Sequence, residues 1–166
     1  MLKFLSIKTN KLSKKNILDI IKLKDMKWKY GLKKQQIFFK KNIKKFDSHN
    51  MLYDKKILVG YTCLRKLKFK RNSRSFKYLI FDTLIIRKKY RHLGFGDKIM
   101  KFNNKIIKKQ KLTAFLICQK RMVFFYRKFN WINSQKILKK KNIMFYPEKL
   151  NTKIFNINSF VELFKF

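Results

Sequence analysis

Acidic residues are scarce in this sequence, and their shortage limits the ligands that it can hold. Only 8 Asp and Glu residues stand beside 45 Lys and Arg residues, so the formal net charge is +37. The acids are scattered along the chain and form no cluster that would hold a polycation. The positive field therefore disfavours polycationic ligands and favours small molecules that carry a carboxylate or a phosphate.

Cysteine, histidine and long apolar runs are also scarce. Cys63 and Cys118 lie in apolar stretches without a CxxC spacing, so we expect reduced thiols in the core of a cytoplasmic protein. His49 and His92 stand alone, which argues against a zinc site or any other metal centre. No apolar run approaches the roughly 18 residues of a membrane span, and the N-terminus lacks a signal-peptide pattern.

The composition otherwise indicates a folded chain. Apolar residues make up 46% of the 166 residues and aromatic residues 16%, which is too apolar for a disordered basic tail. Pro147 is the only proline, and no segment rich in Pro, Gly or Ser divides the chain. We therefore expect one domain over residues 1–166.

The positive charge has two interpretations. It indicates a surface for nucleic acid or another polyanion, or it reflects drift in an AT-rich genome. The basic residues are 38 Lys and only 7 Arg, whereas nucleic-acid surfaces use more Arg, whose planar fork reads phosphates and base edges. Lys, Asn, Ile and Phe, which have AT-rich codons, supply 88 residues. The Lys excess favours drift without excluding the first interpretation.

Strands and helices are mixed along the chain. We expect strands at 2–8, 50–53, 57–69, 78–86, 113–118 and within 136–146, and helices at 16–24, 32–45, 97–110 and 121–129. This order implies an α/β or α+β fold with at least one parallel strand pair, connected right-handedly. Asn103 interrupts the apolar face of the third helix, and the sequence offers no explanation for it.

The most informative segment is LIIRKKYRHLGFGD, residues 84–97, where an apolar strand leads into a loop whose glycines open a helix. A helix N-terminus presents free N–H groups and a partial positive charge, and Gly94 and Gly96 let an anion approach the backbone closely. Lys88, Lys89 and Arg91 add positive charge. The Walker and GxGxxG spacings are absent, so spacing alone leaves a pyrophosphate site and an ordinary turn both open.

The same segment resembles the coenzyme A signature of the GNAT N-acetyltransferases, in which R-x-x-G-x-G follows an apolar strand; here it begins at Arg91. A second block, AFLICQKRMVFFYRKFNWI at residues 114–132, is similar to the family's next strand and its tyrosine-bearing helix. Asn130 stands where the family usually has Gly, Trp131 where it has Phe, and Gln119 where it often has Asn. The resemblance covers most of the chain.

The resemblance implies an α/β (α+β mixed) fold with a central twisted, mostly antiparallel sheet, a splayed parallel strand pair and flanking helices. It implies an N-acetyltransferase with its catalytic core at about residues 50–135, which moves an acetyl group from acetyl-CoA directly to an amine of a small molecule or a protein N-terminus. The pantetheine would pair with the strand and the pyrophosphate would rest on the loop amides. The implied coenzyme-binding residues are Leu84, Ile85, Ile86, Arg91, His92, Leu93, Gly94, Phe95, Gly96, Asp97, Gln119 and Tyr126.

Two residues are candidates for proton chemistry. Tyr126 occupies a position similar to that of the family's general acid, which protonates the coenzyme A thiolate; the alternative is a packing tyrosine on an aromatic helix. Asp82 is the only carboxylate in a predicted core strand. Burial there would make it a base, and the alternative is a structural Asp bonded to the backbone.

The rival class is a non-enzymatic, basic RNA- or ribosome-associated module. It would account for the charge but not for the glycine loop or the second block. Lysines in a stripe with aromatic residues between them would favour RNA, whereas evenly spread lysines would favour drift. The expected partners are acetyl-CoA and an unidentified amine, with no membrane and with nucleic acid as the less favoured partner, for a monomer or a homodimer.

Overall fold

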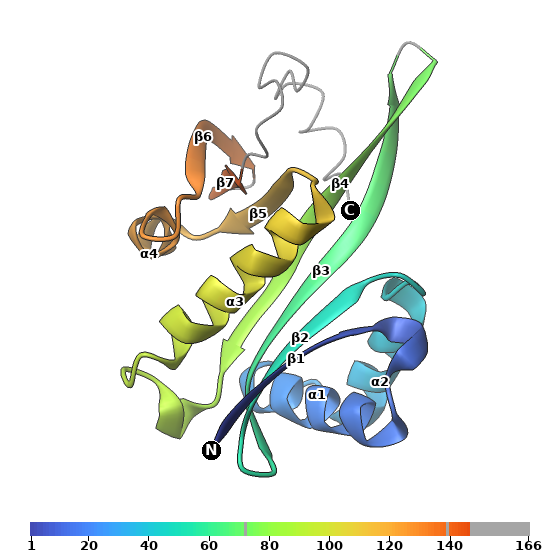
Figure 1. Cartoon of the computed structure of the whole chain (residues 1–166), viewed down its shortest axis with the longest axis vertical. Helices are drawn as coiled ribbons and strands as arrows, with labels where there is room; N and C mark the ends of the chain where they lie inside the picture. The colour runs from blue at the N-terminus through green and yellow to red at the C-terminus, as the bar shows by residue number, and fades with distance from the viewer. Residues whose placement is uncertain (72, 139, 147–166) are drawn as a thin grey trace. The chain divides into compact units, whose positions relative to one another are not determined.

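The fold is known from a computed structural model, which describes residues 1–71, 73–138 and 140–146 (Figure 1). The helices are α1 (Lys14–Lys27), α2 (Leu32–Asn42), α3 (Phe95–Gln110) and α4 (Val123–Arg127), with short 3-10 turns at Thr9–Lys11, Lys88–Tyr90 and Lys120–Met122. The strands are β1 (Leu2–Lys8), β2 (Ser48–Asp54), β3 (Ile57–Arg71), β4 (Arg74–Ile86), β5 (Ala114–Cys118), β6 (Ile132–Leu138) and β7 (Lys141–Tyr146). Residues 147–166 of the predicted domain, which include Pro147, lie outside the described residues.

The seven strands form one mixed sheet in the hydrogen-bonded order β1-β2-β3-β4-β5-β7-β6. The β4–β5 pair is parallel, whereas β1–β2, β2–β3, β5–β7 and β6–β7 are antiparallel. This arrangement confirms the predicted fold class. Contacts group the residues into two compact units: unit 1 is Met1–Lys66 with Phe81–Ile106, and unit 2 is Leu67–Ile80 with Ile107–Phe166.

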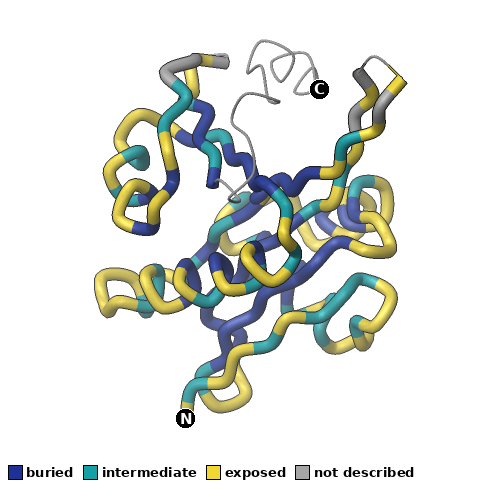
Figure 2. The backbone as a smooth tube through the Cα atoms, turned by 45° about the horizontal axis from the view of Figure 1, so that its top comes forward, coloured by how far each residue is buried: buried dark blue, intermediate teal, exposed yellow. Residues whose placement is uncertain are grey.

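In unit 1 the strands are covered on both faces, because successive side chains of a strand point to opposite sides. Met51, Tyr61 and Ile85 pack with residues of α1 and α2 in one cluster. The neighbouring positions Leu52 and Val59 pack instead with α3. Figure 2 shows these strands as mostly buried, while one side of each helix is exposed. The helices thus form two layers on opposite faces of the sheet.

Asn103, which the sequence left unexplained, belongs to a buried polar network between α3 and the sheet. Its Oδ1 accepts hydrogen bonds from Asn50 Nδ2 at 2.8 Å and from Thr62 Oγ1 at 3.0 Å. Ser6 Oγ in turn donates to Asn50 Oδ1 at 2.8 Å. A buried polar group is costly unless it is hydrogen-bonded, so this network fixes the height at which α3 lies on β2 and β3.

Unit 2 has its own aromatic core. Tyr78, Ile80 and Phe115 form a buried cluster, and Trp131 is 1% exposed beside Tyr146, with ring centroids 5.7 Å apart. The strand expected within residues 136–146 is β7, and it is preceded by β6, which begins at Ile132 and was not predicted. The polar residues at 133–136 obscured β6 in the sequence, and its pairing with β7 is irregular between Asn133 and Ile137.

Gly60 on β3 generates a stability prediction. A Cβ atom at this position would lie 3.0 Å from Ile86 Cδ1 and 3.2 Å from Ile99 Cδ1, so α3 and the end of β4 approach closely because the side chain is absent. We expect Gly60→Val to lower the free energy of unfolding by about 1–3 kcal/mol through overpacking. Urea denaturation measures the change, and Lys68→Val at an exposed position of β3 is the control. An unchanged midpoint for Gly60→Val would contradict this account.

Candidate functional site

The C-terminal half of β4 has an unpaired edge. The parallel register with β5 joins only Leu79 to Ala114 and Ile80 to Phe115, and no β5 pairing follows for the described residues 81–86. Backbone N–H and C=O groups need hydrogen-bond partners. The edge that leads through Leu84, Ile85 and Ile86 therefore has no strand partner among the described residues, and the Ile86 carbonyl there accepts a hydrogen bond from Arg91 Nε.

The loop after β4, residues 91–97, is open to solvent and has the backbone geometry of a tight turn. His92 and Gly94 have positive φ angles of 61° and 72°. Residues 91–94 are exposed, and a Cβ atom on Gly94 would meet no other atom within 4 Å. The space beside Gly94 is thus free of other protein atoms.

Helix α3 begins two residues earlier than expected, at Phe95. Its first intrahelical bond runs from Lys98 N to Gly94 O at 3.1 Å, so the N–H groups of Phe95, Gly96 and Asp97 precede the ladder. These groups and the helix dipole favour a negative charge at the loop. Asp97, which is exposed, supplies one such charge in the first turn.

Contacts on both sides hold this loop in place. Tyr90 donates its hydroxyl hydrogen bond to Asp54 Oδ2 at 3.2 Å, and its ring meets that of Phe95 edge-on at 5.1 Å. Arg91 Nε donates to the carbonyl of Ile86 at 3.1 Å. The Arg87 main-chain N–H donates to the Val59 carbonyl at 2.8 Å. A loop tied at these points is preorganised and loses little entropy when it binds a ligand.

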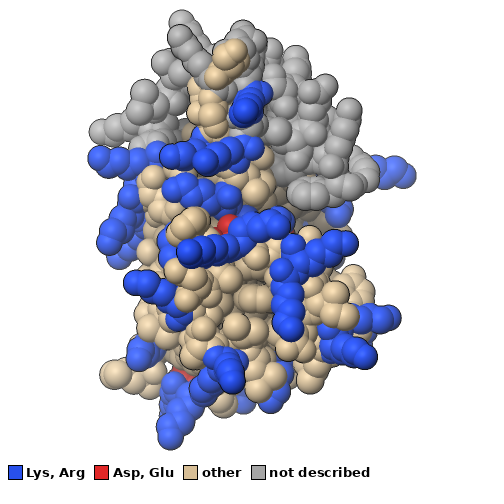
Figure 3. All heavy atoms as spheres, turned by 90° about the vertical axis from the view of Figure 1, so that its right-hand side faces the viewer, with Lys and Arg blue, Asp and Glu red and all other residues tan. Residues whose placement is uncertain are grey.

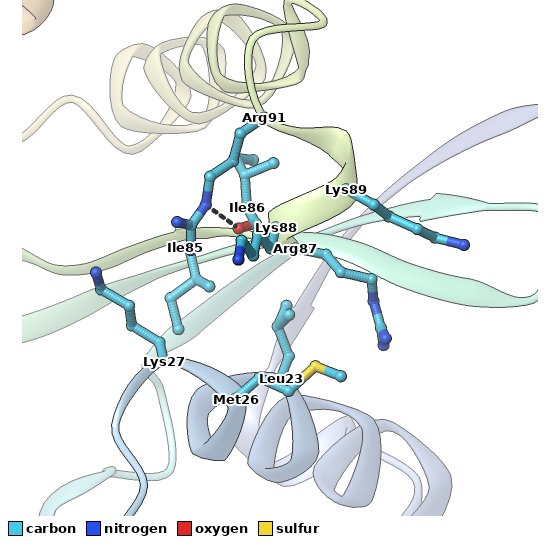
Figure 4. Close-up of a pocket in the computed structure, with 9 residues that line it drawn as sticks. All are labelled: Leu23, Met26, Lys27, Ile85, Ile86, Arg87, Lys88, Lys89 and Arg91. Carbon is cyan, nitrogen blue, oxygen red and sulfur yellow. Dashed lines mark hydrogen bonds between the residues drawn. The ribbon is translucent and has the colours of Figure 1, made fainter.

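A pocket of about 390 Å³ lies where β4 runs into the loop, and we call it the basic pocket. Its apolar part comes from α1 and β4, and its remaining walls carry only positive charge (Figure 4). The lining residues are Leu23, Met26, Lys27, Ile85, Ile86, Arg87, Lys88, Lys89 and Arg91. Apolar surface beside five cations suits a ligand that has both an apolar arm and phosphate groups.

A second, smaller pocket of about 190 Å³ lies further back along β4, and we call it the aromatic pocket. It is lined by Lys24, Trp28, Tyr30, Gln35, Phe38, Asp82 and Thr83. Asp82 is exposed, so its expected burial is wrong. The sequence misled because β4 is apolar nearly throughout, yet this position faces the pocket. Asp82 also has no hydrogen-bond or ion-pair partner among the described residues, so nothing there supports a structural role.

Lys24 is the other charged group of the aromatic pocket. Only 7% of it is exposed, and its Nζ lies 4.5 Å from the ring centroid of Phe38 and 5.9 Å from that of Trp28. Burial lowers the pKa of its ammonium group, and the Asp82 carboxylate partly offsets this. No carboxylate among the described residues lies within ion-pair distance of Lys24. Lys24 was not predictable from the sequence, because only the packing of α1 on β4 brings it to the site.

The candidate residues of the second block lie in unit 2. Tyr126 on α4 is 7% exposed and packs against Phe125 and Trp131, with ring centroids 5.3 and 6.3 Å away. Burial raises the pKa of its phenol well above the usual range, and Cys118 adds to the shift. The phenol is therefore protonated at neutral pH, which suits a proton donor. Gln119 follows β5 and is exposed, and its Oε1 accepts a hydrogen bond from Arg121 Nε at 2.9 Å.

Asn130 and Trp131, which differ from the family pattern, both fit their positions in the structure. Asn130 has a φ of 62°, a left-handed conformation that Asn tolerates and Gly prefers. Trp131 fills the core of unit 2 in place of a smaller ring. Both cysteines are free and buried, as predicted for core thiols. Burial raises the pKa of Cys118 to about 11, which keeps this thiol protonated and unreactive.

Basic side chains are scattered rather than gathered into a stripe on the face shown in Figure 3. Among the described residues, the only ion pairs join the N-terminus to Asp54 at 4.0 Å and Lys15 to Asp19 at 2.6 Å. The scatter favours compositional drift for most of the charge. The described residues contain no group of three side chains that could hold a metal ion. None of the described helices has the length and apolarity to span a membrane.

Known proteins match this chain in fold rather than in sequence. No protein-family model matches the sequence, and no curated protein matches it significantly. Solved structures do match. Escherichia coli ElaA superposes with a TM-score of 0.70 at 13% identity, covering 89% of this chain and 100% of its own. An acyl-CoA N-acyltransferase from Pseudomonas aeruginosa gives a TM-score of 0.67 at 12% identity, covering 87% and 97%.

A third solved structure with a similar fold comes from another organism. The Bacillus subtilis N-acetyltransferase YlbP, in complex with coenzyme A, gives a TM-score of 0.57 at 16% identity, covering 88% of this chain and 96% of its own. These likenesses span nearly the whole of each chain at low identity. They establish that the chain has the fold of the GNAT-type N-acyltransferases, as the resemblance in the sequence predicted.

The exposure of Asp82 leads to a prediction about stability. We expect Asp82→Asn to change the free energy of unfolding by less than about 0.5 kcal/mol, because exposed residues without partners contribute little. Asp47→Asn is the contrasting variant. Asp47 is buried, and its two carboxylate oxygens accept from the main-chain N–H groups of Lys44 at 2.7 Å and Lys66 at 2.9 Å. It should cost about 1–3 kcal/mol in the same denaturation experiment. A larger loss for Asp82→Asn would restore its structural role.

Proposed function

We propose that this chain is a cytoplasmic, acyl-CoA-dependent N-acyltransferase, folded as one catalytic domain, that transfers an acetyl group from acetyl-CoA to a primary amine. The basic pocket carries the proposal, because it combines the open edge of β4, an apolar wall and five cationic side chains. Coenzyme A has the matching parts: an extended pantetheine with amide groups, and phosphates at its other end. Its complex with YlbP, a protein of the same fold, supports this assignment.

Each part of coenzyme A is assigned to its own set of residues. The main chain of Leu84, Ile85 and Ile86 pairs with the amides of the pantetheine, as an added strand would. The amides of residues 92–97 receive the pyrophosphate at the start of α3. Arg91 and the lysines of the basic pocket neutralise the remaining charge. Gln119 lies at the end of β5 and contributes to the same coenzyme.

The chemistry needs a proton donor and a site for the amine. Bound acetyl-CoA supplies a thioester, whose carbonyl carbon the amine attacks and whose sulfur leaves as a thiolate. Tyr126 then gives its phenolic proton to that thiolate, because the phenol is protonated at neutral pH. Asp82, exposed in the aromatic pocket, accepts the proton that the amine loses, directly or through water.

Coenzyme binding provides the first test of this function. Acetyl-CoA at about 100 times its Kd should stabilise the protein by about 2.7 kcal/mol, which raises the melting temperature by about 5–10 °C. Gly94→Glu should abolish the rise, because the added carboxylate enters the space beside Gly94 and repels the pyrophosphate.

The matched control is Gly94→Asn, which tolerates the same positive φ without adding charge and should retain coenzyme binding. Calorimetry of both variants separates loss of binding from loss of fold. If saturating acetyl-CoA produces neither a melting shift nor heat with the wild-type protein, the proposed function is wrong.

The role of Tyr126 provides a second test. Tyr126→Phe keeps the ring in its aromatic cluster and removes the hydroxyl, so kcat should fall about 10²–10⁴-fold, as for loss of a general acid. Melting temperature and coenzyme affinity should stay near those of the wild type. Tyr146→Phe removes another hydroxyl beside Trp131 and should keep its kcat. Near-normal turnover by Tyr126→Phe on any accepted amine would show that another group delivers the proton.

A further inference from the structure

The aromatic pocket holds two opposite charges that form no ion pair or side-chain hydrogen bond among the described residues. Asp82 is exposed, so its carboxylate is hydrated and open to a ligand. Lys24 is buried against two aromatic rings, and the Asp82 carboxylate offsets only part of the effect of that burial. A desolvated cation without an ion-pair partner is unfavourable, so Lys24 is poised for an anionic group of a ligand.

The turn between α1 and α2, which contributes residues to the pocket, is held by several hydrogen bonds. The Trp28 carbonyl accepts from Gln35 Nε2 at 2.9 Å and from the Tyr30 main-chain N–H at 2.7 Å. Asp25 Oδ1 accepts from the Gly31 main-chain N–H at 2.7 Å. Gln35 is only 4% exposed. The aromatic walls therefore keep their places in the absence of a ligand.

Size and surface restrict the ligand further. The volume of about 190 Å³ is below the range of roughly 300–1,000 Å³ for drug-sized ligands, so the pocket holds one small molecule or one small group. Trp28, Tyr30 and Phe38 supply apolar, aromatic surface. Tyr30 and Phe38 are 64% and 41% exposed, so they leave the mouth open for entry.

We propose that the aromatic pocket binds the acyl acceptor, and that this acceptor is a free α-amino acid with an apolar side chain. Its carboxylate meets Lys24, and its amino group lies beside Asp82. Its side chain packs on the rings of Trp28 and Phe38. The inference rests on the proposed function and names the substrate class of that reaction.

The charges exclude the other simple classes of amine. A diamine would bring a second cation close to Lys24, and the net charge of +37 repels it before it binds. A neutral apolar amine would leave Lys24 buried without a partner. A peptide N-terminus has an amide where the free amino acid has its carboxylate, so it also fails to pair with Lys24.

The reaction balances for this substrate. The ammonium group of the amino acid loses one proton to Asp82, which releases it to solvent. The nitrogen then forms a bond to the thioester carbonyl carbon, and the carbon–sulfur bond breaks. The second proton lost by nitrogen balances the proton that the leaving thiolate takes up. The products are an N-acetylamino acid and coenzyme A, with one proton released.

The first experiment compares three acceptors that differ in one group. With saturating acetyl-CoA, kcat/KM is measured for phenylalanine, phenylalanine amide and phenethylamine, and leucine serves as the aliphatic case. A charge-assisted contact to Lys24 should favour phenylalanine over the other two aromatic amines by at least about 10-fold. Equal rates for the three, or a preference for phenethylamine, would overturn the assignment of the carboxylate.

Variants of Lys24 test which residue makes the distinction. Lys24→Met keeps the unbranched apolar stem and should remove most of the preference for phenylalanine, with the loss mainly in KM. Lys24→Arg keeps a cation and should restore part of it. Lys22→Met removes the same charge from an exposed position of α1 and should behave as the wild type. A preference that survives in Lys24→Met would refute the role of Lys24.

A binding measurement without turnover tests the acceptor class separately from the proposed function. Saturation-transfer NMR of phenylalanine and phenethylamine is recorded on the wild-type protein with bound coenzyme A. If coenzyme A binds but neither phenylalanine nor leucine does, the acceptor class is wrong and the proposed function stands. If coenzyme A itself fails to bind, the proposed function is wrong. Stronger transfer to phenylalanine than to phenethylamine, lost in Lys24→Met, supports the proposal.

Discussion

The free edge of β4 is the constraint on which the rest of the candidate site depends. Pairing with β5 stops after Ile80, yet β4 continues to Ile86, with Phe81, Thr83 and Ile85 buried. A covered strand with an open edge leaves main-chain donors and acceptors beside apolar side chains. The two pockets lie along this one stretch, the aromatic pocket at Asp82 and the basic pocket at Ile85 and Ile86. The strand thereby sets an order along the site, with the aromatic pocket before the basic pocket.

Features that depend on neighbouring residues were predictable from the sequence. The apolar run into β4, the glycine turn and the start of α3 each depend on local preferences, and the structure places the helix within two residues of the prediction. The left-handed conformation of Asn130 is local in the same sense. These features carried the resemblance to the GNAT enzymes, which is why the fold could be predicted although no family model matches the sequence.

Features that depend on packing were not predictable. Lys24 and Asp82 are far apart in the sequence, and they meet in one pocket only because α1 lies on the face of the sheet to which Asp82 points. The sequence pattern of β4 suggested that Asp82 was buried, because its neighbours are apolar on both sides. The strand β6 was missed for a related reason, since it is held by pairing with β7 at its two ends and its middle is polar and irregular. Asn103 needed the positions of Asn50 and Thr62 to be understood.

The charge of the chain acts differently on the two pockets. The net charge of +37 attracts anionic molecules such as coenzyme A, and lysines scattered as on the face in Figure 3 do not specify which one. Discrimination needs desolvated groups at fixed positions, because solvent screens exposed charges and leaves buried ones effective. The basic pocket has mostly exposed cations and is suited to capture. Lys24, held at 7% exposure between aromatic rings, is the cation whose surroundings suit selection. The scattered surface charge and the proposed selection by Lys24 are therefore separate properties, since the first depends on exposed groups and the second on a buried one.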